Sequence, residues 1–114
     1  MHELPITEQI IKIAEEHCTK AGASRVTNIS LVIGENSGVE GGSIRMYFDV
    51  ISEGTCCEGA DLTMTPVKPQ LRCKNCGKLF VRAPFSFSCP DCGADGEPTE
   101  IGREFYIDTI EVED

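Results

Sequence analysis

The stretches Cys73-Lys-Asn-Cys76-Gly77 and Cys89-Pro-Asp-Cys92-Gly93 decide the fold of the second half of this chain, and twelve residues separate the two Cys-X-X-Cys pairs. In such a turn both thiolates point at one ion, and the following glycine supplies the positive φ that the turn requires. Four thiolates complete a tetrahedron and leave no open coordination position, so we expect a structural rather than a catalytic metal. The predicted ligands are Cys73, Cys76, Cys89 and Cys92.

Zinc is the metal that this site favours, because each Cys-X-X-Cys turn supplies two soft ligands. Binding of a structural zinc is worth about 10–16 kcal/mol in zinc-finger peptides, and in a short loop this becomes folding energy. Leu79-Phe80-Val81, and then Phe85 and Phe87, are expected to form short strands of a zinc ribbon. A single iron on four thiolates is the alternative, because Cys-Pro-Asp-Cys-Gly is also typical of rubredoxin.

Length and composition limit the class of protein. The chain has 114 residues, of which 40% are hydrophobic, so we expect one domain, or one domain and a small metal module. Its formal net charge of −9 disfavours nonspecific binding to nucleic acid. No apolar run has the length of a signal peptide or a membrane span. The seven cysteines therefore predict metal binding in the cytoplasm, with no membrane partner, rather than a disulfide framework.

Helical and strand periodicities flank the cysteine stretch on both sides. They predict helices at 6–21 and at 44–53, the second capped by Ser43, and strands at 25–33, 60–67 and 104–112. The apolar phase shifts within the last strand, which predicts a bulge. The expected fold class is α+β: a two-layer sandwich of a three-stranded sheet and two helices, with an inserted four-cysteine module. The expected domains are 1–69 with 101–114, and 70–100.

A second candidate metal site lies at the N-terminus, in Met1-His2-Glu3. The α-amine, the His2 amide nitrogen and the His2 imidazole close fused chelate rings, and the Glu3 amide nitrogen completes a square of four nitrogens. Square-planar nitrogen ligation suits Ni(II) and Cu(II). Most N-terminal histidines belong to disordered termini, so the pattern alone is a weak indication.

Two further features have weaker readings. Lys68, Arg72, Lys74, Lys78 and Arg82 form a basic run with no acidic residue between them, which raises the alternative of a zinc-ribbon adaptor for nucleic acid or transcription machinery. The acidic remainder of the chain and the lack of interleaved stacking aromatics favour a solvated face or a protein-binding surface instead. The vicinal pair Cys56-Cys57 receives no role. No nucleophile and base pattern is evident, so we expect no enzyme activity.

Taken together, the Met1-His2-Glu3 start, the amphipathic helix, Gly34, the segments Glu53-Gly54-Thr55 and Glu58-Gly59, and the two cysteine pairs resemble the HypA/HybF family. These proteins are nickel metallochaperones of [NiFe]-hydrogenase maturation and, in some organisms, of urease. The resemblance covers essentially the whole chain. Pro5 departs from it, because relatives often have a small capping residue such as Ser at that position.

The resemblance implies a nickel-binding α/β domain and a zinc domain. It implies His2 as the main nickel ligand, with contributions from the Met1 amine and the backbone of His2 and Glu3, and it assigns zinc to the four cysteines. The implied cofactors are structural Zn²⁺ and transported Ni²⁺. The implied partners are the nickel-handling GTPase of the pathway and the hydrogenase large subunit; a homodimer is a further candidate assembly.

Overall fold

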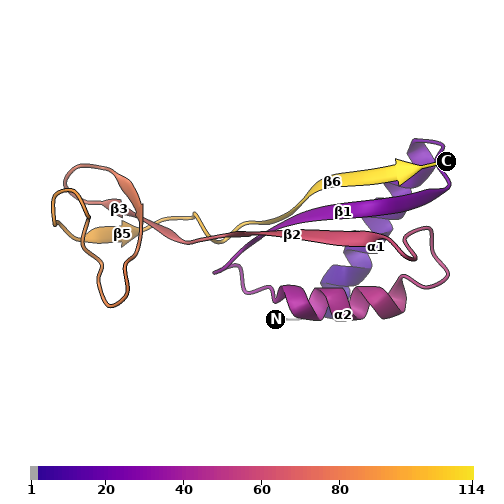
Figure 1. Ribbon diagram of the computed structural model, residues 1–114, viewed down its shortest axis with the longest axis horizontal. Coiled ribbons are helices and arrows are strands. Elements are labelled where there is room, and N and C mark those ends of the chain that lie inside the picture. Colours follow the sequence, from indigo (N-terminus) through magenta and orange to yellow (C-terminus); the bar gives the residue numbers. More distant parts are fainter. Residues whose placement is uncertain (1–2) are drawn as a thin grey trace.

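The computed structural model describes residues 3–114, which form an elongated molecule of 54 × 25 × 16 Å. Two helices and three strands make up one end of the molecule, and three short strands make up the other (Figure 1). The first group is α1 (Glu3–Lys20), β1 (Arg25–Gly34), α2 (Gly41–Ile51), β2 (Asp61–Val67) and β6 (Phe105–Glu113). The second group is β3 (Gln70–Cys73), β4 (Leu79–Val81) and β5 (Gly96–Pro98). This mixed architecture confirms the expected α+β class.

The larger sheet has the strand order β2-β1-β6, with β2 parallel and β6 antiparallel to β1. The register between β1 and β6 shifts between Ser30 and Leu31, whose partners are Thr109 and Ile107, so Asp108 is the extra residue of a bulge. This confirms the expected bulge and explains why the apolar phase of the last strand changes.

Both helices pack on one face of this sheet and form the main core with it. Val26, Ile29 and Leu31 of β1 are fully buried on that face. Val26 and Ile29 share it although they are three residues apart, because the register with β6 also shifts between Val26 and Asn28. Ile44 and Phe48 of α2 are buried against them. The strand residues that point away, such as Asn28 and Ser30, are only half-buried. The sheet therefore has one face buried against the helices and one face that is partly exposed to solvent.

Helix α1 starts earlier than its sequence predicted. It begins at Glu3 rather than at residue 6, so Pro5 is its third residue. Proline is tolerated there because N–H groups in the first turn of a helix have no intrahelical acceptor. The buried Thr7 hydroxyl donates to the Glu3 carbonyl at 2.7 Å. Gly22, with φ of 68°, lies just beyond the C-terminal end of the helix.

The cap of α2 also differs from the expectation. The helix begins at Gly41, and Glu40, not Ser43, is its N-cap. The Glu40 carboxylate accepts from the backbone N–H groups of Gly42 at 3.0 Å and Ser43 at 2.8 Å. Because the capping residue lies three positions earlier than expected, the helix starts about one turn nearer the N-terminus. The negative charge of Glu40 also interacts favourably with the positive end of the helix dipole.

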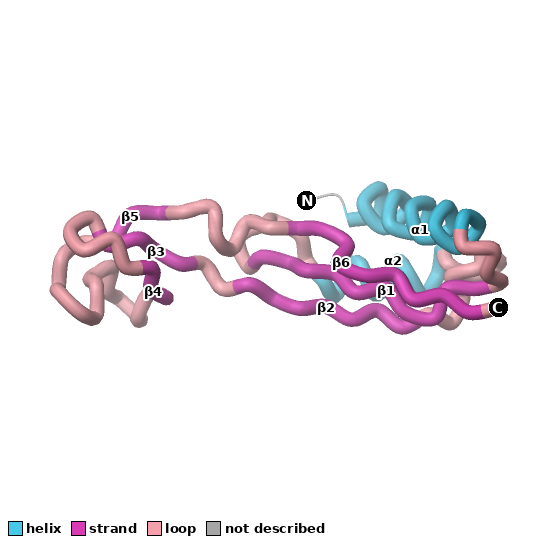
Figure 2. Tube along the Cα trace, turned by 90° about the horizontal axis from the view of Figure 1, so that it is seen from above, coloured by secondary structure: helices cyan, strands magenta, loops and turns pink. Residues whose placement is uncertain are grey.

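The smaller sheet has the strand order β4-β3-β5, and both pairings are antiparallel. Leu79-Phe80-Val81 forms a strand as expected. The expectation for Phe85 and Phe87 was wrong, because both lie outside the strands, and β4 instead pairs with β3. Two short connections join this sheet to the larger one (Figure 2).

The connections between the sheets are held by the loop that follows β1. Backbone N–H groups of Glu35 and Asn36 donate to the carbonyls of Val67 at 2.9 Å and Gly102 at 2.7 Å. A Cβ atom at Gly34 would overlap the backbone carbonyl of Gly102, so only glycine fits there. One loop thus binds both the outgoing and the returning chain.

Candidate metal centres

The four cysteines of the smaller sheet come from two turns with the same backbone geometry. Cys73 is the last residue of β3, and the turn continues to Gly77, which has φ of 77°. In the second turn Gly93 has φ of 78°. In each turn the glycine N–H donates to the carbonyl of the first cysteine, at 3.0 Å and 2.9 Å respectively. The structure confirms that the glycine after each pair takes the positive φ that the turn needs.

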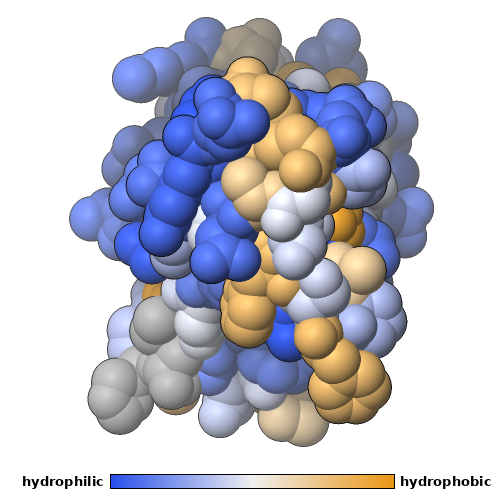
Figure 3. Space-filling view, turned by 90° about the vertical axis from the view of Figure 1, so that its left-hand side faces the viewer, coloured by the Kyte–Doolittle hydropathy of each residue, from blue (hydrophilic) through white to orange (hydrophobic). Residues whose placement is uncertain are grey.

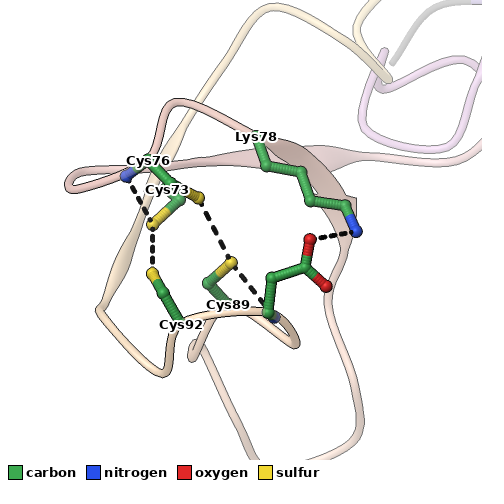
Figure 4. Close-up of polar contacts among 6 residues, drawn as sticks. Cys73, Cys76, Lys78, Cys89 and Cys92 are labelled. Atoms are coloured by element: carbon green, nitrogen blue, oxygen red, sulfur yellow. Dashed lines mark hydrogen bonds and ion pairs between the residues drawn. The ribbon is translucent and has the colours of Figure 1, made fainter.

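The four Sγ atoms converge on one point (Figure 4) and all lie within 4.8 Å of one another. The Sγ atoms of Cys73 and Cys92 are 3.3 Å apart, and those of Cys76 and Cys89 are 3.8 Å apart. Zinc–sulfur bonds of about 2.3 Å in a tetrahedron place the sulfurs about 3.8 Å from one another. The residues present therefore fit a four-thiolate metal ion, with Cys73 and Cys89 buried and the other two exposed.

Backbone N–H groups prepare the site for negative charge. Asn75 and Cys76 donate to Cys73 Sγ at 3.4 Å, and Asp91 donates to Cys89 Sγ at 3.4 Å. The bond from the Cys76 N–H, above all, lowers the pKa of Cys73 to about 6.

The second proton is harder to remove. The Lys78 N–H favours the Cys76 thiolate, but the Cys73 thiol, then burial and the thiols of Cys89 and Cys92 outweigh it and raise the pKa of Cys76 to about 11. Four close thiols do not all ionise by themselves at neutral pH. A bound cation is what makes a complete set of thiolates favourable.

An ion pair that sequence reasoning missed connects the two turns. Lys78 Nζ lies 2.8 Å from Asp91 Oδ2, at the edge of the sulfur cluster (Figure 4). Both side chains are about half-exposed, so the pair contributes little stability of its own. Lys78 belongs to the basic run, as does Arg72, which donates to the Gly77 carbonyl at 3.2 Å. Part of the basic run therefore makes contacts within the small sheet.

The N-terminal candidate site falls mostly outside the described residues, because Met1 and His2 precede them. Glu3 is described, as the first residue of α1. Its carboxylate accepts from the backbone N–H of Glu40 at 3.0 Å, which joins the start of α1 to the start of α2. N–H groups of Gly42 and Ser43 lower the pKa of the Glu40 carboxyl. No local sequence signal predicts this contact, because 36 residues separate Glu3 from Glu40 in the chain.

The vicinal cysteines are part of the core rather than a metal site. Cys57 is fully buried, and burial, followed by the proximity of Cys56, raises its pKa to about 12. Burial and the nearby Cys18 likewise raise the pKa of Cys56. Within residues 3–114, the four cysteines of the small sheet are the one group of His, Cys, Asp or Glu side chains close enough together to hold an ion. Thiols held in the protonated form are inert at neutral pH.

Neither helix of the described chain is long and apolar enough to cross a membrane.

Comparison with known proteins matches this chain to one family over nearly its whole length. Residues 1–112 match the family model described as hydrogenase/urease nickel incorporation, metallochaperone, hypA. A hydrogenase maturation factor HypA from Caldanaerobacter subterraneus subsp. tengcongensis is 42% identical over 114 residues, which cover 99% of this chain and all of the relative. One from Dehalococcoides mccartyi is 38% identical and is covered to 96% of its length.

Solved structures agree with the sequence comparisons. A solution structure of a HypA protein superposes with a TM-score of 0.70 at 26% identity, covering 98% of this chain and 96% of the other. The solution structure of the Ni metallochaperone HypA from Helicobacter pylori gives a TM-score of 0.64 at 26% identity, covering 99% and 98%. With its four-thiolate site and its whole-length match, this chain belongs to the HypA family of hydrogenase/urease nickel-incorporation metallochaperones.

Proposed function

We propose that this chain binds Ni(II) at its N-terminus and delivers it for the maturation of [NiFe]-hydrogenase, or of urease. The proposed ligands are the His2 imidazole, the Met1 amine and the backbone nitrogens of His2 and Glu3. Family membership supports nickel as the cargo. The nitrogen-rich start of the sequence supports the place where it binds.

The observation that carries the N-terminal assignment is the position of Glu3 as the first residue of α1. The first N–H groups of a helix have no intrahelical acceptor. The Glu3 amide therefore becomes a metal ligand without breaking a helical hydrogen bond. The Glu3 carboxylate meanwhile accepts from the Glu40 N–H, which joins Glu3 to the start of α2.

The mechanism that this arrangement supports is transfer and not catalysis. Nitrogen ligands near the N-terminus would exchange their ion with an acceptor that offers better ligands. We propose that the four cysteines have the opposite task and hold Zn²⁺ as a closed structural site, with all four tetrahedral positions filled by protein. The thiolates of Cys73, Cys76, Cys89 and Cys92 would be its ligands.

Further parts of the proposal follow from the family. We propose that residues 1–69 with 101–114 form the nickel domain and residues 70–100 the zinc domain. The partners would be the nickel-handling GTPase of the pathway and the hydrogenase large subunit, in the cytoplasm, and a homodimer is a third assembly to test. The chain would have no enzyme activity of its own.

Metal analysis of the His2→Ala variant tests the proposal. The wild-type chain should hold one tightly bound zinc and take up one exchangeable nickel, whereas His2→Ala should keep zinc and fold but lose stoichiometric nickel binding. His17→Ala is the matched control, because His17 is the other histidine of the chain and is exposed on α1. Unchanged nickel affinity in His2→Ala would sink the N-terminal assignment.

Nickel binding should also depend on pH in a definite direction. An imidazole has an ordinary pKa of about 6.5, and protons compete with the metal for the imidazole, the amine and the amide nitrogens. Nickel should therefore be released as the pH falls below about 6.5. Titration of nickel at pH 5.5 and at pH 7.5 measures this, and equal affinity at the two values would contradict nitrogen ligation.

A further inference from the structure

The loop that joins β4 to the second cysteine turn, residues 82–88, presents aromatic side chains to solvent. Phe85 is 100% exposed and Phe87 is 55% exposed, and the neighbouring Val81 at the end of β4 is 53% exposed. Seen from this end of the molecule, apolar residues form a band between hydrophilic ones (Figure 3). Apolar patches of this kind on a small protein mark binding surfaces.

Contacts within the loop fix its conformation, so the exposure of its aromatic side chains is a defined feature of the structure. The Arg82 guanidinium lies over the Phe87 ring at 4.4 Å, and Arg82 Nε donates to the Ser86 carbonyl at 3.3 Å. The Ser86 N–H in turn donates to the Ala83 carbonyl at 3.2 Å. These contacts hold the two ends of the loop and leave Phe85 between them at the tip.

The backbone of Phe85 adds an independent observation. Its φ is +59°, and among residues 3–114 it is the one non-glycine residue with a positive φ. This conformation is unfavourable for a bulky side chain and persists where the surrounding structure holds it, most often at binding and functional sites. A glycine would relax the strain, but it would remove the exposed ring.

A hollow beside the loop completes the surface. It has a volume of about 620 Å³ and is lined by apolar groups of the small sheet and the loop, among them Pro69, Val81 and Phe87. Lys68, Arg82 and Glu35 also line it, so two of its three charged groups are positive. The surface therefore combines an apolar knob, an apolar hollow and positive charge at the rim. Its complement is a protein surface with an apolar pocket edged by carboxylates.

The direction in which the loop projects indicates which protein would dock on it. In Figure 1 the loop extends below the strands at the end opposite the helices, toward the side on which α2 lies. The start of α2 is joined to Glu3 by the bond between the Glu3 carboxylate and the Glu40 N–H. A protein seated on the loop therefore approaches the same side of the molecule as the start of α2 and Glu3.

We propose that Phe85 is the anchor for the protein that receives nickel from this chain, with Phe87 and the adjacent hollow as its surroundings. This inference rests on the proposed function. The acceptor would offer an apolar pocket edged by carboxylates to the Phe85 ring and its rim of Lys68 and Arg82. Nucleic acid is the less suitable occupant, because the net charge of the chain is −9 and one face of the Phe87 ring is covered by Arg82.

Binding of the full chain to the nickel-free hydrogenase large-subunit precursor tests the inference. Phe85→Ala should weaken the dissociation constant about tenfold or more, as truncation of an anchoring aromatic does. It should slow nickel transfer to the precursor, while nickel affinity and zinc content stay at wild-type values. Tyr106→Ala is the matched control. Tyr106 is a 51% exposed aromatic on β6 and pairs with Val32, and its face of the sheet is the one away from the helices.

Several outcomes would overturn the inference. These are wild-type binding of the precursor by Phe85→Ala, an equal loss in Tyr106→Ala, and no binding of the precursor by the wild-type chain. An effect of Phe85→Ala confined to the GTPase, to the oligomeric state or to binding of a single-stranded oligonucleotide would do the same. A wild-type chain that takes up no nickel would instead overturn the proposed function. Arg82→Ala, which removes the brace but keeps the ring, should give a smaller loss than Phe85→Ala.

Discussion

Removal of the metal from the four cysteines should unfold the small sheet and leave the larger sheet folded. The perturbation is a strong chelator under reducing conditions, which prevents disulfides from replacing the metal. The small sheet buries only Cys73, Phe80 and Cys89, and two of these are metal ligands. The core of the larger sheet and its helices contains eleven buried hydrophobic residues, none of which is a ligand of the four-cysteine site. The two cores therefore respond differently to the same treatment.

The magnitudes explain this difference. Phe80 is the one buried side chain of the small sheet that is not a ligand, and burial of a phenylalanine contributes about 1.5–3 kcal/mol. Binding of a structural zinc contributes about 10–16 kcal/mol in comparable small modules. Without the ion, one buried ring has to offset the conformational entropy of the whole module, at about 1–2 kcal/mol for each ordered residue. The burial of Phe80 is far too small to offset that entropy.

Amide NMR spectra of the full chain provide the assay. On chelation, the signals of residues 70–100 should collapse to the narrow dispersion of an unfolded chain, while those of β1, β2 and β6 keep their positions. One equivalent of zinc should restore the original spectrum, and Cys73→Ser should give the collapsed spectrum without a chelator. A metal-free small sheet that keeps its dispersion, or a larger sheet that unfolds with it, would refute the reasoning.

Two further predictions concern the larger sheet. Gly34→Ala should destabilise the chain by at least about 1–3 kcal/mol in urea unfolding, because its Cβ overlaps the Gly102 carbonyl and lies 2.8 Å from the Arg103 nitrogen; wild-type stability would contradict the close packing. Cys57 should resist alkylation in the native chain and react in urea. Because its folded pKa of about 12 lies above the ordinary value of 9.0, its stabilising contribution is present below about pH 9 and is lost as the pH rises toward 12. The free energy of unfolding should therefore fall less over that range in Cys57→Ala than in wild type, and equal slopes would argue against the raised pKa.

Local patterns predicted much of the fold. The alternation in residues 25–33 and 60–67 matches β1 and β2 closely, and the phase change in the last strand corresponds to the bulge at Asp108. These signals work because side-chain direction repeats with a period of two in a strand. The errors in the larger sheet's helices lay at their starts. Helix α1 begins at Glu3 rather than at residue 6, and the N-cap of α2 is Glu40 rather than Ser43. Helix starts depend on which side chain reaches the free N–H groups, and several nearby residues compete for that role.

The small sheet shows the same limit. Short aromatic segments suggested strands at Phe85 and Phe87, but the actual partners of the central strand are β4 and β5. Strands of three residues carry almost no periodic signal, so pairing depends on where the metal turns place the chain. The exposure of Phe85 and its positive φ were not foreseeable for that reason.

The sequence by itself determined the four-thiolate site, because each Cys-X-X-Cys-Gly turn is complete within five residues and needs no distant contact to aim its sulfurs. It also carried the family resemblance, through the Met1-His2-Glu3 start and the two cysteine pairs. Only the tertiary structure decided that Glu3 meets Glu40, that Lys78 pairs with Asp91 across the two turns, and that Gly34 packs against Gly102. These contacts join residues far apart in the chain, and their partners are selected by the packing of whole elements rather than by local spacing.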